Sequence, residues 1–570
     1  MAISMKFTTF GLMAALMVVL AGCTDDQASK ESSTAALEQE SMVKVNTVMA
    51  SPVVDAKAYT IIAKKGMLPV HDDVTLPVWS FNQAIPGPEL RVQVGDTVKI
   101  KLQNELEEPV SIHWHGYPVP NAMDGIPGVT QDAVAAGKEF VYEFKATIPG
   151  TYWYHSHQDS VNQLDKGLYG SFIVEDPNEQ YDRDYTLMLD EWMSQTAVDS
   201  ASEEKREEEG HAAMEGMDHG KEPQEQSHSS DMNHDEQQVN EGGHNNMNHG
   251  MTGQNEEQAA DGEHEEGGMD HSGMNMMNME GHDMSMYDLY TINGRTGDST
   301  SKLMVKEGEK VRLRLINAGY ITHRMHLHGH EFKVIALDGQ PVNSPATISD
   351  QALAIAPGER IDIEFVANNP GSWWLEEHGS DERVKGMRTL IQYEGEEAAD
   401  RSNADEVLPE FDPVLYGKQA DTKFTLKQNY DQQVHMDLDT AMKDGEMVYT
   451  INGKVFPDTD RISVKKGEKV MVTFVNQSMT EDHPMHLHGH FFQVLSKNGK
   501  PLQGSPMIKD TLNVRPGETY VVAFEADNPG DWMFHCHDLH HASAGMVTDV
   551  QYKDYQSNYV PDPLVGNKPE

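Results

Sequence analysis

A short stretch near the end of the chain combines the residue types that hold a copper ion. It contains His535, Cys536 and His537, followed by His541 and Met546. If the chain is extended around Cys536, side chains alternate between faces, so His535 and His537 point one way and Cys536 the other. A thiolate, two imidazoles and a distant thioether are the ligands of a blue electron-transfer copper. Cys536, His541 and Met546 supply three of these four ligands, so a second histidine has to come from elsewhere.

Histidine clusters upstream of this stretch complete a pattern. They are His113 with His115, His155 with His157, and His483 followed by His486 and His488. In chain order, H-x-H-G, H-x-H, H-P-x-H-x-H and H-C-H-x3-H-x4-M resemble the four copper motifs of the multicopper oxidases, the family of laccases, cuprous oxidases and ferroxidases. The alternative, a chance gathering of histidines in solvated loops, is disfavoured because the motifs are complete and in order.

The resemblance implies four coppers per chain and gives each motif residue a role. The blue, type 1 copper would be held by His483, Cys536 and His541, with Met546 axial. The type 2 copper would be held by His113 and His486, one type 3 copper by His115, His155 and His537, and the other by His157, His488 and His535. Electrons would then pass from Cys536 through its backbone to His535 and His537, towards a cluster between the first and last domains.

Two further positions bear on the protons that O2 reduction consumes. Asp124 matches an acidic residue that the family places near the cluster, where it would relay protons or orient a ligand histidine. An ordinary Asp-Gly turn with Gly125 is an equally good interpretation. Some members of the family carry a glutamate just after the last copper histidine, but here that residue is Ala542, which leaves the proton route open.

The N-terminus resembles the export signal of a bacterial lipoprotein. Lys6 precedes an apolar run over residues 7–20, and the sequence LAGC at 20–23 resembles a lipobox. We expect residues 1–22 to be removed, Cys23 to carry a lipid that anchors the chain in a membrane, and residues 23–55 to form a flexible tether. By the sorting rules of lipoproteins, Thr24 favours the outer membrane, facing the periplasm. The formal net charge of −48 disfavours nucleic acid as a partner.

Internal repeats predict the domain organisation. The sequence YTING at 290–294 recurs at 449–453, and residues 305–311 recur at 464–470. Short alternating apolar runs separated by Gly, Pro and Asn are typical of strands. We therefore expect an all-β fold of three cupredoxin-like, Greek-key β-sandwich domains, the plan that the resemblance implies. The expected boundaries are 56–195, 287–400 and 421–570, with a linker at 401–420.

The repeats also indicate which domains have lost a blue copper site. The first domain has Ser156 where the third has Cys536, and the second has Glu377 there and Glu382 in place of His541. The second domain nevertheless keeps a near copy of the 483–490 motif at 323–330, including His326 and His328. We interpret these histidines as relics of a lost site, with an accessory metal site as the alternative.

Residues 196–286 form an insertion of unusual composition. Its span 201–286 has 22 acidic and 3 basic residues, no Phe, Trp, Tyr, Leu or Ile, and 12 methionines with 9 histidines. Such a segment cannot bury a core and is expected to be disordered alone. Thioethers match Cu(I) and imidazoles also bind Cu(II), so we expect it to bind extra copper ions. A plain acidic linker is the alternative.

Together these features predict an oxidase that couples one-electron oxidation of a substrate to the four-electron reduction of O2 to water. The Met/His-rich insertion favours Cu(I) as the substrate, in copper tolerance. A laccase acting on phenols is the alternative within the same class. A copper-sequestering lipoprotein, whose oxidase centre is incidental, is the alternative from another class.

Overall fold

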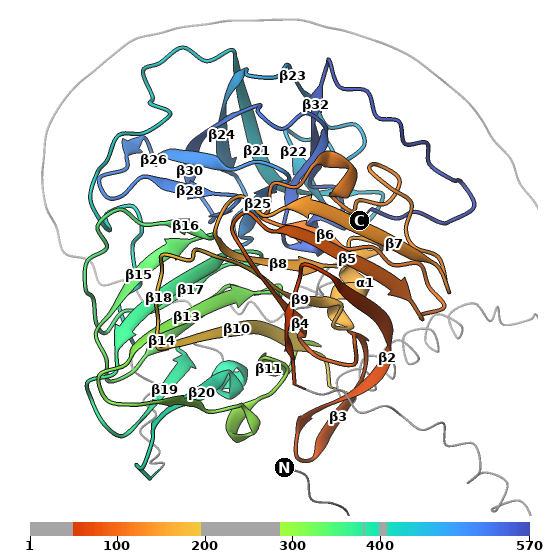
Figure 1. Cartoon of the computed structure of the whole chain (residues 1–570). Helices are drawn as coiled ribbons and strands as arrows, with labels where there is room; N and C mark the ends of the chain where they lie inside the picture. The colour runs from red at the N-terminus through yellow and green to blue at the C-terminus, as the bar shows by residue number, and fades with distance from the viewer. Residues whose placement is uncertain (1–49, 195–285, 380–381, 398–406, 570) are drawn as a thin grey trace, which may run out of the picture. The chain divides into compact units, whose positions relative to one another are not determined.

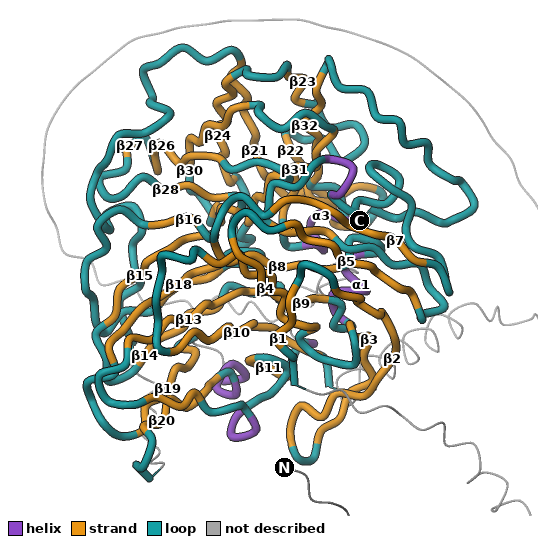
Figure 2. The backbone as a smooth tube through the Cα atoms, in the orientation of Figure 1, coloured by secondary structure: helices purple, strands orange, loops and turns teal. Residues whose placement is uncertain are grey.

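The structure is a computed structural model that describes residues 50–194, 286–379, 382–397 and 407–569. The predicted signal peptide, Cys23, most of the tether and nearly all of the insertion lie outside these residues. Across the described ranges strands predominate and helices are short (Figure 2). None of the helices in this part of the chain is long and apolar enough to cross a membrane. The strands form six sheets, which confirms the predicted all-β class.

The first two sheets belong to the first domain and enclose a core of their own. Strand β5 shows why they form, because Val98, Ile100 and Leu102 alternate with polar residues and point inward. One sheet has the order β3 (Val74–Phe81), β2 (Tyr59–His71), β5 (Thr97–Asn104) and β7 (Glu139–Lys145). The other has the order β1 (Val53–Asp55), β4 (Gly87–Gln93), β9 (Tyr169–Glu175), β8 (Gly150–His155) and β6 (His113–His115), and the short helices η1 (Asn121–Met123) and α1 (Ser160–Asp165) lie in its connections.

The second domain is a sandwich of six and five strands. The larger sheet has the order β11 (Leu289–Ile292), β10 (Arg183–Trp192), β13 (Lys310–Asn317), β18 (Arg360–Val366), β15 (Phe332–Leu337) and β16 (Gln340–Pro341). The smaller has the order β12 (Leu303–Val305), β20 (Arg388–Tyr393), β19 (Ser372–Glu377), β14 (His323–Leu327) and β17 (Leu353–Ile355), with η3 (Gly297–Ser299) and η4 (Glu382–Gly386) in its connections.

The third domain repeats this plan. Its larger sheet has the order β22 (Glu446–Ile451), β21 (Gln432–Lys443), β24 (Lys469–Asn476), β30 (Thr519–Glu525), β26 (Phe492–Lys497) and β27 (Lys500–Pro501), with β28 (Met507–Lys509) paired to β26. Its smaller sheet has the order β23 (Ile462–Val464), β32 (Val547–Tyr552), β31 (Asp531–Cys536), β25 (His483–Leu487) and β29 (Thr511–Val514), and helix α3 (Leu539–Ser543) connects β31 to β32.

Strand β10 corrects the predicted boundary between the first two domains. We expected the first domain to extend to residue 195, but β10 pairs with β13 and β11 of the second domain (Figure 1). The first domain therefore ends after Glu175, and it begins at β1, within the predicted tether. The reason is topological, because β10 and β11 form the same hairpin as β21 and β22 in the third domain. In the sequence, the insertion thus stands between β10 and β11 where the third domain has the short turn of Asp444 and Gly445. It therefore interrupts the sequence of the second domain.

The C-terminal segment returns to the first domain. The backbone N–H of Asp159 donates to the carbonyl of Lys568 over 2.8 Å, and Asn567 Nδ2 donates to Asp132. The carbonyl of Pro569 lies 2.5 Å from Nδ1 of His157, one of the motif histidines. The C-terminal end of the described chain therefore lies beside His157, one of the residues expected to hold copper.

Candidate metal centre

The extended backbone of β31 places Cys536 and its neighbouring histidines on opposite faces. The Cys536 Sγ lies 3.6 Å from His541 Nδ1 and 3.9 Å from His483 Nδ1, and all three residues are buried. A metal ion bonded to a sulfur at about 2.3 Å and to a nitrogen at about 2.05 Å, with a trigonal angle between the two bonds, holds the sulfur and the nitrogen about 3.8 Å apart. The three atoms therefore surround a point that fits a trigonal copper ion. Met546 is buried in the same hydrophobic core cluster as Cys536.

Eight histidines gather on the other side of this strand. They come from β6, β8 and the residues after it in the first domain, and from β25 and β31 with the residues after each in the third: His113, His115, His155, His157, His486, His488, His535 and His537. All eight are at least 98% buried. Potential ligand atoms lie within 4.8 Å of one another in the trio of His157, His488 and His535 predicted for one type 3 copper. The structure thus brings together every histidine that the sequence predicted for the cluster.

The chemistry of these side chains fits metal ions. Burial, reinforced by neighbouring histidines, holds the pKa of His155, His488 and His537 well below its usual range, so the imidazoles are neutral, the form that binds metals. Among the residues that the structure describes, Nε2 of His113 and Nε2 of His486 have no hydrogen-bond partner although both are buried. Buried polar atoms are rarely left so, and copper ligation would satisfy them.

His115 presents its other ring nitrogen to the cluster. Its Nε2 lies 3.1 Å from the hydroxyl of Thr511, and the buried Nδ1 has no hydrogen-bond partner among the described residues. The same Thr511 hydroxyl lies 3.0 Å from His486 Nδ1, which also lies 3.0 Å from the carbonyl of Asp510. Thr511 and Asp510 therefore fix the orientation of two histidines predicted to be copper ligands, a role that the sequence did not predict.

The second domain reaches this centre through Arg360, whose side chain is completely buried. Its guanidinium donates to both carboxylate oxygens of Asp510, over 2.7 and 2.6 Å, and to the carbonyl of Thr151 in the first domain. Burial alone would raise the pKa of Asp510, but the charge of Arg360 holds that pKa well below its usual range. Gly116 has a positive φ of 76° and no room for a side chain, because a Cβ there would lie 2.3 Å from the guanidinium. Arg360 thus links all three domains beside the cluster.

The Asp124 side chain contacts two histidines that are predicted to be copper ligands. Its carboxylate oxygens lie 3.1 Å from His488 Nδ1 and 3.2 Å from His113 Nδ1, and the side chain is 1% exposed. A carboxylate there favours the tautomer with Nδ1 protonated, which leaves Nε2 to face the cluster. This geometry suits orientation of the ligands. Ala542 packs in an apolar group with Ile126 and Met533.

In the second domain a carboxylate replaces the thiolate. His323 stands where the third domain has His483, and its Nε2 lies 3.3 Å from Glu191 and its Nδ1 3.8 Å from Glu377. Burial alone would lower the pKa of His323, but the charge of Glu191 raises it. Sequence reasoning missed Glu191, because it was assigned to the first domain. The described residues at this position supply no thiolate for a blue copper.

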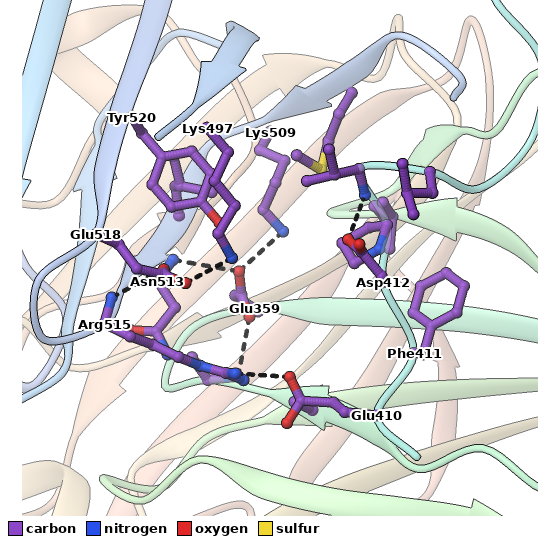
Figure 3. A pocket seen from close by; sticks show the side chains of 18 of the residues that line it. Glu359, Glu410, Phe411, Asp412, Lys497, Lys509, Asn513, Arg515, Glu518 and Tyr520 are labelled. Atoms are coloured by element: carbon purple, nitrogen blue, oxygen red, sulfur yellow. Dashed lines mark hydrogen bonds and ion pairs between the residues drawn. The ribbon is translucent and has the colours of Figure 1, made fainter. Parts of the chain in front are cut away.

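Two cavities lie along the boundary of the second and third domains. One, of about 390 Å³, is lined by His541 together with Glu377, Glu481, Asp482 and Asp538. The other, of about 460 Å³, contains no predicted copper ligand (Figure 3). Its walls carry ion pairs, among them Lys509 with Glu359 and Arg515 with Glu410, which join the domains and the segment between them. Of these two cavities, only the smaller one is lined by a predicted copper ligand, His541.

The fold and these centres define a class, the copper proteins built from cupredoxin-like sandwiches. Three family models described as multicopper oxidase match residues 63–179, 183–396 and 422–556. The chain is 30% identical over 500 residues to multicopper oxidase MmcO of Mycobacterium tuberculosis, covering 86% of this chain and 87% of that protein. It is 25% identical to copper resistance protein A of Escherichia coli, covering 83% and 89%.

The crystal structure of a laccase from Botrytis aclada shares the fold, with a TM-score of 0.60 and 22% identity over 91% of each chain. The chain belongs to the multicopper oxidase family. It is accordingly a copper-containing oxidoreductase that uses O2 as acceptor, and the second family match begins at β10, where the structure also places the boundary.

Proposed function

We propose that this oxidase acts on Cu(I), and that His541 faces the entry site. The observation that carries the proposal is the acidic character of the cavity at His541. Four carboxylates and two guanidiniums line it, and the carboxylates of Asp538 and Glu481 lie 3.4 and 3.9 Å from His541 Nε2. A negative cavity concentrates small cations near the surface. Met479, which is 89% exposed, stands two residues before Glu481 and offers a soft thioether suited to Cu(I).

The position of the insertion supports the same substrate. Residues that flank it are joined, because the backbone N–H and the hydroxyl of Ser194 both donate to the carboxylate of Asp288. Next to this junction, the Tyr287 hydroxyl lies 3.2 Å from Nε2 of His540, the neighbour of His541. The Met/His-rich segment is therefore tethered beside the proposed entry site. Copper held on a tethered segment has a raised effective concentration at a nearby site.

The ligand roles implied by the family form part of this proposal. His483, Cys536, His541 and Met546 would hold the type 1 copper, and the eight buried histidines the other three. Bound copper would supply single-electron transfer at the first site and O2 reduction at the cluster. Four Cu(I) ions are oxidised to Cu(II) while one O2 and four protons become two water molecules. The protein contributes a covalent link between the sites, because Cys536 is bonded through its backbone to His535 and His537.

The test compares two substrates on the parent protein and three variants. In one variant, residues 195–286 are replaced by the Asp-Gly turn found at 444–445, which suits the same hairpin. In the others, Met479 or the exposed Met442 is changed to Leu, the latter as a matched control. Loss of the insertion or of Met479 should lower Cu(I) oxidation at limiting copper severalfold and leave oxidation of a phenolic dye unchanged. Equal losses on both substrates, or no loss on Cu(I), would contradict the proposal.

Two alternatives remain distinguishable. A laccase acting on phenols is favoured only if phenol turnover exceeds Cu(I) turnover in the intact protein. A copper-sequestering role predicts that Cys536→Ser leaves the copper tolerance of cells unchanged.

We also propose that the chain is exported and anchored through a lipid on Cys23, in the outer membrane facing the periplasm. Growth with a labelled fatty acid checks this: label on the parent but not on Cys23→Ala is expected, and no label on either contradicts it.

A further inference from the structure

The second domain carries its own cluster of metal-binding side chains, far from the blue site in sequence and separate from the eight histidines. His326 lies on β14, and His328 follows that strand directly. Glu376 lies on β19, and His378 follows it. Alternation along paired strands puts all four side chains on the face opposite Met325 and Leu375, which pack in the core.

The four side chains converge. His328 Nε2 lies 3.0 Å from His378 Nε2 and 2.9 Å from a carboxylate oxygen of Glu376. The ring of His326 is centred 4.6 Å from that of His328 and 5.3 Å from that of His378. His326, His328 and Glu376 are at least 91% buried, while His378 is partly exposed, so the cluster has an opening to solvent.

The register shows how this cluster relates to the oxidase centre. His326 pairs with Glu376 as His486 pairs with His535 in the third domain. The Nε2 of His488 lies 3.0 Å from the Nε2 of His535, and the corresponding contact of His328 with Glu376 measures 2.9 Å. A carboxylate thus occupies the place of an imidazole with the ligand spacing preserved.

His326 is also held as a metal ligand is held. Its Nδ1 lies 3.0 Å from the carbonyl of Gln351, just as His486 Nδ1 lies 3.0 Å from the carbonyl of Asp510. A histidine whose Nδ1–H donates to a carbonyl keeps its Nε2 lone pair for a metal, the arrangement usual in metal sites. A decaying relic would not need to preserve this second contact.

We propose that His326, His328, His378 and Glu376 form a mononuclear Cu(II) site in the second domain, additional to the four coppers of the oxidase. Ligand atoms about 2.05 Å from a metal and at right angles to one another are about 2.9 Å apart, whereas tetrahedral ligands are about 3.3 Å apart. The separations of 2.9 and 3.0 Å, which belong to an ion pair and a hydrogen bond in the structure, are compatible with the right-angled case. A tetragonal set of nitrogen and oxygen ligands is typical of Cu(II). The accessory site is therefore favoured over the relic that the sequence suggested.

The test uses the full chain with its four oxidase coppers loaded. Glu376→Gln keeps the shape of the side chain and removes the carboxylate, and His328→Gln removes an imidazole. His435→Gln, at an exposed histidine on β21, is the matched control. Each protein is dialysed against Cu(II) buffered by a competing chelator, and bound copper is counted as free Cu(II) rises. Because every protein carries the insertion, its copper binding is common to all and cancels in the comparison.

The parent and His435→Gln should bind one more Cu(II) than the two site variants, with a tetragonal, nitrogen-coupled electron paramagnetic resonance signal. Glu376→Gln should weaken the binding of this additional Cu(II) at least about tenfold, because removing even an outer partner of a metal site has an effect of that size. Identical isotherms for parent and Glu376→Gln, with the blue absorption retained, would overturn the proposal. Displacement of this copper by equimolar Zn(II) would overturn the assignment to Cu(II). If His328→Gln loses its blue colour through misfolding, Glu376→Gln alone decides.

Discussion

Arg360 offers the sharpest test of how the second domain supports the copper cluster without supplying a ligand to it. In Arg360→Met, Asp510 loses both bonds from the guanidinium, at 2.7 and 2.6 Å, and remains buried. Removing one partner of a buried ion pair costs about 3–5 kcal/mol of stability. Because Asp510 and Thr511 hold His486 and His115, we also expect about 10–100-fold weaker copper binding at these histidines. That loss corresponds to about 1.4–2.7 kcal/mol.

Arg312→Met is the matched control for this substitution. Arg312 is a buried arginine of the same sheet, paired with Asp362 and Glu179, and none of its contacts involves a predicted copper ligand. Both variants should unfold at lower temperature. Only Arg360→Met should lose type 2 copper on dialysis against a chelator, measured by copper content and electron paramagnetic resonance, while its blue absorption persists. Equal copper retention in the two variants would refute the reasoning, because Arg360 would then serve stability alone.

Three further predictions concern Cys536, Asp124 and Asp165. Cys536→Ser should lose the blue absorption and all oxidase turnover, and blue colour surviving in that variant would exclude Cys536 as the type 1 ligand. If the Asp124 carboxylate orients His488 and His113, Asp124→Asn should bind cluster copper about 10–100-fold more weakly than the parent. Full copper content with an altered pH profile of kcat would instead assign Asp124 to proton relay. Burial raises the pKa of Asp165 to about 7, so its contribution to stability is present below about pH 4 and is lost as the pH rises through 7. The free energy of unfolding should therefore fall as the pH rises over this range, and this group contributes at most about 1.4 kcal/mol per pH unit to the fall. The fall should be less steep in Asp165→Asn. Equal slopes in the parent and the variant would exclude Asp165 as the cause.

The copper motifs were predictable because they are local. Alternation around Cys536 depends only on the geometry of one strand, and the structure places His535 and Cys536 on opposite faces accordingly. Arg360 was not predictable, because its contact with Asp510 joins residues 150 positions apart in two domains. The sequence around each of them carries no pattern that indicates the other.

The boundary at β10 was missed for a different reason. Residues 183–192 adjoin the first domain in sequence, and the insertion separates them from their partner β11. A signal was nevertheless available. In the third domain the YTING repeat at 449–453 follows a strand at 432–443, so the copy at 290–294 required a corresponding strand. Residues 201–286 contain no Phe, Trp, Tyr, Leu or Ile, so their sequence offers no strand pattern, and the pattern points to residues before 195.

The separation of the cluster's two halves along the chain constrains when the centre can assemble during protein synthesis. His115 and the Thr511 that holds it are 396 positions apart, and Asp124 and His488 are 364 apart. A nascent chain emerges from its N-terminus, so the histidines of β6 and β8 are made long before β25 and β31 exist. Until then, four imidazoles of the first domain lack the partners that orient and bury them. The contact of His157 with Pro569 comes later still. The complete set of cluster histidines thus requires a chain synthesised through β25 and β31, and a polypeptide interrupted before β25 would present the first domain's histidines without their partners from the third domain.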